Sequence, residues 1–127
     1  MDMKSKKTSF AVTKSTLEFE NLLLSHMDIP RTVFHRRMID FFFNKHIKVH
    51  EYLLITDRSD PNYVQRKVLE QIYIDEERLE KLEKAAKEYG CRIGIILCQA
   101  LMSYCIEVAP EVLGPEYMAE YFGFNAS

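Results

Sequence analysis

The second half of the chain carries a polar and apolar pattern whose period changes along its length. Residues 68–74 are rich in β-forming side chains, and their alternation leaves Gln71 and Tyr73 on the polar face of a predicted strand. Residues 75–89 follow with acidic side chains first and Gly90 at the end, as in a surface helix. Its apolar positions form one stripe: Leu79, Leu82, Ala86 and Tyr89.

The next predicted helix, residues 92–108, is apolar on nearly every side and should end before Pro110. Most of its surface must therefore be buried. A unit of about 40 residues cannot bury such a helix alone, which implies that a partner unit packs against it.

A weaker copy of the same order precedes this unit by about 60 residues. Phe10 and Val12 alternate with Ser9, Ala11 and Thr13, as in a strand. Residues 15–18 read as a capping box, and residues 33–45 form a second predicted helix after a proline in its first turn. The segment is either a second unit of the same kind or an unrelated helical hairpin that follows a strand.

The chain is therefore divided into residues 1–45, a linker over 46–66, residues 67–108, and a tail over 109–127. Residues 57–62 form the obvious loop of the linker, whereas residues 46–56 either extend the preceding helix or add a strand. The acidic and aromatic tail is either a short helix from Pro115 that packs on the core or an extended segment that binds a protein partner.

One region carries a recognisable arrangement: a short strand over 72–74, an amphipathic helix, Gly90-Cys-Arg92-Ile-Gly94, and a buried helix with Gln99-Ala-Leu101. It resembles the ribbon-helix-helix family of small bacterial and phage DNA-binding regulators, over about a third of the chain. The resemblance implies a mostly α-helical fold of two tandem strand-helix-helix units. Their strands would form a short antiparallel β-ribbon in a pseudo-dimer, within one chain or between two chains.

The resemblance also implies how such a fold contacts DNA. Its ribbon enters the major groove, where outward side chains read bases, and the start of each second helix binds a phosphate. Carried over by position, the base-reading residues are Ser9, Ala11, Thr13, Gln71 and Tyr73, and the phosphate-contacting residues are Arg31, Thr32, Arg92 and Gly94. The sequence departs from the family because Arg and Lys are absent from these ribbon positions and Glu70 adds a negative charge nearby.

The net charge of −2 is unusual for a DNA-binding protein, but the charge is unevenly distributed. The first 50 residues have nine Lys and Arg against five acids, and the remainder has eight against fourteen. The basic half should supply most phosphate contacts, and Lys4, Lys6 and Lys7 are candidates beside the first strand. The same lysines would equally suit a solubilising tail.

Other chemistry receives little support. Cys91, Cys98 and Cys105 are seven residues apart, which predicts reduced thiols in a core helix rather than a metal site or disulfide. His46 and His50 have a metal-chelating spacing on a helix but no evident third ligand, and His35 is expected at the surface or an interface. No catalytic motif is recognisable, so we expect no enzyme activity, cofactor or metal.

No apolar run approaches the ~20 residues of a membrane span, so we expect a cytoplasmic protein that does not enter membranes. The expected function is a sequence-specific DNA-binding regulator of transcription or of a plasmid or mobile element. We expect double-stranded DNA as the partner and a homodimer or higher assembly, with the tail as a possible site for a protein partner. The alternative is an antitoxin-like or degenerate member that binds protein and does not read DNA.

Overall fold

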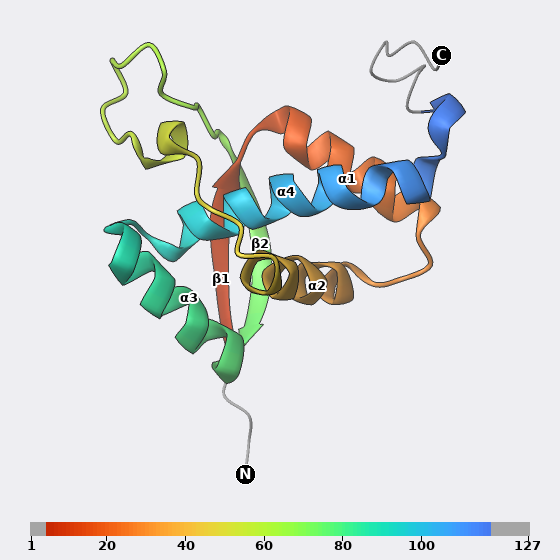
Figure 1. The fold of residues 1–127 in the computed structure, drawn as a ribbon, viewed down its shortest axis with the longest axis horizontal. Coiled ribbons are helices and arrows are strands. Elements are labelled where there is room, and N and C mark those ends of the chain that lie inside the picture. Colours follow the sequence, from red (N-terminus) through yellow and green to blue (C-terminus); the bar gives the residue numbers. More distant parts are fainter. Residues whose placement is uncertain (1–4, 118–127) are drawn as a thin grey trace.

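The structure is a computed structural model that describes residues 5–117, and it is mostly helical with one two-stranded antiparallel sheet (Figure 1). Each strand is followed by two helices. The elements in chain order are β1 (Ser5–Val12), α1 (Lys14–His26), α2 (Arg31–Asn44), the short 3₁₀ helix η1 (Glu51–Leu54), β2 (Val68–Asp75), α3 (Glu76–Tyr89) and α4 (Ile93–Leu113).

The two strands pair along their whole length within the one chain. Ser5 lies opposite Asp75 and Val12 lies opposite Val68, which places Ser9 directly opposite Gln71 in the middle of the sheet. The expected antiparallel pairing of these segments is thus confirmed. Strand β1 begins earlier than the alternation around Phe10 suggested.

Both strands lead into helices that begin with a side-chain cap. The Thr13 side chain accepts a hydrogen bond from the Thr16 amide, and the Asp75 side chain accepts one from the Arg78 amide. Such caps satisfy amides that have no partner in the first turn of a helix. The capping box predicted at residues 15–18 is wrong, because the helix has already begun at Lys14.

Helix α4 is the centre of the core and contacts α1, α2, α3 and β1 (Figure 1). By length and composition alone it is apolar enough to cross a membrane. Here its apolar side chains instead pack against those of the other elements in one hydrophobic core. Its fully buried residues include Ile96, Leu97 and Leu101. The predicted need of this helix for partners on several sides is confirmed.

Helix α4 continues through Pro110 to Leu113, so its predicted end before the proline is wrong. Pro110 is exposed, and its carbonyl accepts a hydrogen bond from the Gly114 amide, which closes the last turn. A new helical turn begins at Pro115, and the Tyr117 ring lies edge-on to His26. The predicted tail beyond residue 117 lies outside the described residues.

The connector between α2 and β2 is held against the second pair of helices. The Val49 amide donates to the Tyr89 hydroxyl, and the His50 amide donates to the Gln99 side chain. Neither a helix extension nor a strand forms over residues 46–56, because the chain instead makes η1 with Leu53 buried. The predicted loop at residues 57–62 is present as a series of turns.

Candidate nucleic-acid interface and the buried cluster beneath it

One face of the sheet is exposed and the other faces the core. Within β2 the burial alternates, with Glu70, Ile72 and Ile74 buried and Leu69, Gln71 and Tyr73 exposed. The outward face therefore includes three consecutive cross-strand pairs, Lys7 with Tyr73, Ser9 with Gln71, and Ala11 with Leu69. The Lys7 ammonium lies 5.6 Å from the centre of the Tyr73 ring, which confirms that the two side chains share this face.

Four of the five predicted base-reading residues, Ser9, Ala11, Gln71 and Tyr73, thus lie together on the outward face. Thr13 does not belong with them, since it follows the end of β1 and its hydroxyl caps α1. Sequence reasoning did not place two members of this face among the base-reading residues. Lys7 was expected to contact phosphate beside the first strand or to belong to a solubilising tail, and Leu69, with 68% of its surface exposed, was not considered.

The predicted phosphate-contacting residues are spread over several places. Lys6 and Lys7 lie in β1 and are exposed, whereas Lys4 lies outside the described residues. Thr32 is exposed in the first turn of α2, and Arg92 is exposed at the N-cap of α4. Gly94 lies close to the sheet, because a Cβ placed on it would be 3.6 Å from the Phe10 Cβ.

The Arg31 side chain forms ion pairs beneath the sheet. Its Nη1 atom lies 2.9 Å from a carboxylate oxygen of Glu20 and 2.9 Å from one of Glu70. Its Nη2 atom also donates to the Asn21 side chain. A phosphate would have to displace these acceptors, so the position that matched a family phosphate contact has a different local role here.

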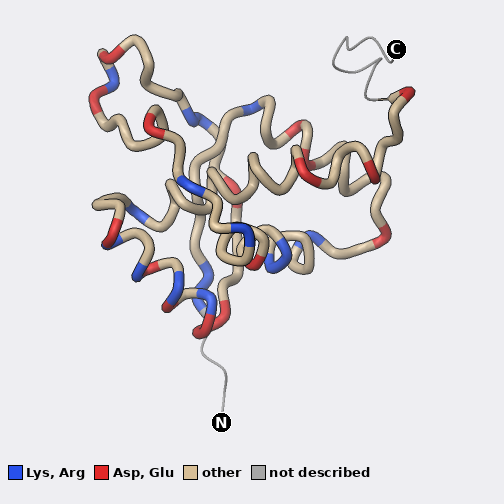
Figure 2. The backbone as a smooth tube through the Cα atoms, viewed as in Figure 1, with Lys and Arg blue, Asp and Glu red and all other residues tan. Residues whose placement is uncertain are grey.

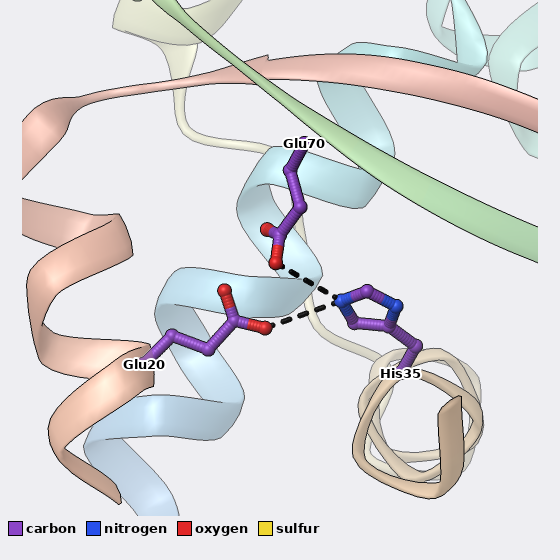
Figure 3. A group of neighbouring side chains, drawn as sticks. All are labelled: Glu20, His35 and Glu70. Carbon is purple, nitrogen blue, oxygen red and sulfur yellow. Dashed lines mark hydrogen bonds and ion pairs between the residues drawn. The ribbon is translucent and has the colours of Figure 1, made fainter. Parts of the chain in front are cut away.

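A buried polar cluster surrounds this guanidinium, and Figure 3 shows three of its side chains converging from different elements. Glu20 comes from α1, His35 from α2 and Glu70 from β2. The Nε2 atom of His35 lies 3.1 Å from a Glu20 oxygen and 3.3 Å from a Glu70 oxygen. The three side chains are 0%, 3% and 5% exposed, respectively.

Two sequence expectations are corrected by this cluster. His35 is buried instead of lying at the surface. It shares the core-facing side of α2 with the buried residues Phe34 and Met38. Glu70 does not add a repelling charge to the outward face, because it shares the inward face of β2 with Ile72 and Ile74. Its carboxylate instead contacts Arg31 and His35.

Burial and mutual contact shift the pKa values within the cluster. Burial raises the pKa of Glu20 to about 7, and its contacts with His35 and Arg31 only partly oppose this shift. Burial by itself would lower the pKa of His35, but its hydrogen bonds to the two carboxyl groups outweigh that effect and raise it. Burial likewise opposes ionisation of Glu70, yet contacts with His35, Glu20 and Arg31 lower its pKa overall.

Glu20, His35 and Glu70 are also the kind of ligand set that holds a divalent cation, and their ligand atoms all lie within 4.8 Å of one another. A positive charge is already supplied there by Arg31, which lies between the two carboxylates. The arrangement is therefore a hydrogen-bonded ion cluster. A metal ion could enter it only after the guanidinium moved away.

The other candidate ligands do not gather. His46 and His50 are exposed and lie outside any helix, so their predicted helical spacing does not bring them to one face. Cys98 and Cys105 are buried on α4, as expected for core thiols, and burial raises the pKa of Cys98 to about 11. Cys91 is half-buried after α3.

Comparisons with protein-family models, with curated proteins and with solved structures each found no match for this chain. The surface and the buried cluster described above therefore provide the basis for inferring its function.

Proposed function

We propose that the protein is a DNA-binding regulator in which two fused ribbon-helix-helix units place the outward face of their shared sheet in the major groove. The observation that carries this proposal is the outward face formed by Lys7, Ser9, Ala11, Leu69, Gln71 and Tyr73, of which all but the half-buried Ala11 are exposed. A two-stranded ribbon is narrow enough to enter the major groove of B-form DNA, which is about 12 Å wide.

The spacing of equivalent features supports two units of one kind. The capping residues Thr13 and Asp75 are 62 residues apart, and so are Arg31 and Ile93, the first residues of α2 and α4. Ser9 and Gln71 have the same separation and pair with each other. A pseudo-twofold axis passing between these two residues would account for all three observations.

The side chains on this face have the donors, acceptors and methyl groups that base edges recognise. Gln71 can pair with adenine through two hydrogen bonds, and Lys7 can donate to guanine. Ala11 and Leu69 offer apolar contacts for the methyl group of thymine. The mixture favours direct reading of bases over purely electrostatic attachment.

The proposal is tested by selecting a preferred duplex from a random library and measuring affinities by fluorescence anisotropy. Gln71→Ala should weaken binding to the selected site by about 5- to 150-fold, which corresponds to about 1–3 kcal/mol, and should hardly affect random DNA. Lys7→Gln should weaken binding to the selected site more than Lys84→Gln. The latter makes the same charge change on the exposed side of α3.

A protein-binding function is the second candidate, and the exposure of Leu69 and Tyr73 specifically favours it. These large side chains are 68% and 54% exposed on the same face, and such groups are common at protein interfaces. Absence of salt-sensitive binding of the wild-type protein to duplex DNA would reject the regulator proposal in favour of this one. We further propose that two copies associate on DNA, which sedimentation with and without duplex would test.

A further inference from the structure

A pocket of about 460 Å³ lies beside the sheet, where the connector passes the start of α4. Its walls come from both strands, the connector and the first turn of α4. The residues that line it include Ser9, Ala11 and Leu69. The pocket is thus continuous with the face proposed to meet DNA, with which it shares Ser9, Ala11 and Leu69.

The pocket is strongly basic. Lys6, Arg58, Arg66 and Arg92 contribute to its lining, and no Asp or Glu occurs among the described residues that line it. The Nη1 atom of Arg66 is buried and has no hydrogen-bond partner of good geometry among the described residues. The guanidinium lies close enough to the Cys98 thiol to oppose the rise in the pKa of that thiol, but a thiol is only a weak acceptor. A buried charged donor without a strong acceptor is costly, and an anion in the pocket would supply one.

The connector loop carries both acidic and basic residues (Figure 2), and its acids Asp57 and Asp60 bind donors of the same loop. The Asp57 carboxylate accepts hydrogen bonds from the amide and hydroxyl of Ser59, and the Asp60 carboxylate accepts one from the Asn62 amide. These local turns direct both acids to the loop's own backbone. On the other side of the pocket, the long helix α4 begins with Arg92, whose side chain makes no capping hydrogen bond. Its first amides add a positive potential.

The geometry points to a binding site for a phosphate group, and we propose that DNA backbone beside the sheet supplies this phosphate. Only the source of the phosphate rests on the proposed function, because the same donors would hold free inorganic phosphate. Guanidinium groups suit phosphate particularly well, since their planar donors match its oxygens.

The site would make the DNA contact one-sided. At the start of α2, the matching flank of the sheet, the guanidinium of Arg31 is bound by Glu20 and Glu70. Arg31 therefore does not form a matching basic pocket on the flank next to α2. We expect stronger backbone contact on the flank next to α4 than on the flank next to α2.

The DNA arm of the test uses Arg58→Gln and Arg66→Gln, with Lys84→Gln as a control for the charge change. Arg58 is exposed, so its variant should fold even if loss of the half-buried Arg66 side chain perturbs the connector. Each pocket variant should reduce the slope of log affinity against log salt by about 0.9 per lost phosphate contact. Ethylation of phosphates should interfere with binding of the wild-type protein on one flank, and Arg58→Gln should abolish that signal.

The second arm titrates inorganic phosphate at constant ionic strength and follows the Arg guanidinium NMR signals. Shifts at Arg58, Arg66 and Arg92 that saturate, and that Arg58→Gln weakens, would support a phosphate site even if the wild-type protein binds no DNA. DNA binding with salt slopes unaffected by both pocket variants would reject the DNA source. No saturable shift in this arm, together with unchanged slopes in the first, would overturn the phosphate site itself.

Discussion

The α1–α2 side of the sheet and the α3–α4 side bury different kinds of residue at matching places. Glu20, Arg31 and His35 on the first side correspond, 62 residues later, to Leu82, Ile93 and Leu97 on the second. Leu82 and Leu97 are fully buried. The same separation relates Thr8 of β1 to Glu70 of β2. Under the proposed tandem arrangement, one unit is thus packed around an ion cluster and the other around aliphatic side chains.

Under that arrangement, the fold does not require the ion cluster. The α3–α4 side packs without one, and buried ion pairs generally stabilise proteins no better than apolar residues of similar volume. The cluster also needs residues from both halves of the chain, because Glu70 belongs to β2 while its partners belong to α1 and α2. If β1 paired with β1 of another copy, Thr8 would replace Glu70 and the cluster would lose one carboxylate.

Breaking the cluster at one residue should give the largest effect on stability. His35→Leu, the residue found at the matching position 97, removes the buried group that bridges Glu20 and Glu70. We expect the free energy of unfolding to fall by about 3–5 kcal/mol, as for other broken buried ion pairs. Urea denaturation followed by circular dichroism would measure it, and a change below about 1 kcal/mol would contradict this account of the cluster.

Replacing the whole cluster should have the opposite sign. The combined variant Glu20→Leu, Arg31→Ile, His35→Leu and Glu70→Thr gives the first side the residues of the second. We expect stability equal to that of the wild-type protein or higher by about 1–4 kcal/mol, again from urea denaturation. If the cluster favours pairing of β1 with β2 of the same chain, the combined variant should more often pair β1 with β1 of another copy. Sedimentation should then detect a larger fraction of dimers for this variant.

The pH dependence of the protein's free energy of unfolding should come from the α1–α2 side of the sheet. The raised pKa values of Glu20 and His35 add stability at low pH that is lost as the pH rises past about 4.5 for Glu20 and 6.5 for His35. The lowered pKa of Glu70 acts oppositely, but mainly below its ordinary value of 4.5. Between pH 5 and 8, the free energy of unfolding should therefore decrease by about 1–3 kcal/mol.

Glu20→Gln should flatten this pH profile, because the amide does not titrate in this range. Glu83→Gln, on the exposed side of α3, should leave the profile unchanged. Thermal melts at several pH values would give both profiles. A wild-type stability that rises from pH 5 to 8 would show that the signs assigned to Glu20 and His35 are wrong.

The helix caps should show the smallest difference between the two sides. Thr13→Ala removes one side-chain acceptor for a backbone amide and should cost about 1 kcal/mol. Asp75→Ala should cost somewhat more, because the Asp75 carboxylate also contacts the Arg78 guanidinium. Equal losses in urea denaturation would mean that the contact with Arg78 contributes little, as is common for partly exposed ion pairs.

The sequence predicted the features that depend on local chemistry. The position of Gly90, in the left-handed conformation at the end of α3, follows from the freedom of glycine to adopt positive φ. The apolar surface of α4 predicted its burial. The burial of Glu70 was also predictable, since its position is in phase with Ile72 and Ile74. It was instead expected near the outward face because it is acidic.

Features that depend on distant contacts escaped sequence reasoning. His35 carries no local signal for burial, because its partners Glu20 and Glu70 come from other elements. The basic pocket was missed for a related reason. Arg58, Arg66 and Arg92 lie in the half of the chain with excess acids, and the fold brings them together around a pocket whose described lining contains no acid. Net charge along a sequence does not locate a charged surface.

The pairing of β1 with β2 inside one chain has a consequence for how the protein responds to dilution. A sheet assembled from two separate chains dissociates as the protein concentration falls, so its melting temperature depends on concentration. Here residues 13–67 connect the two strands within one chain, and formation of the sheet is a first-order event. The surface centred on Ser9 and Gln71 is therefore complete in each molecule, even when a cell contains very few copies.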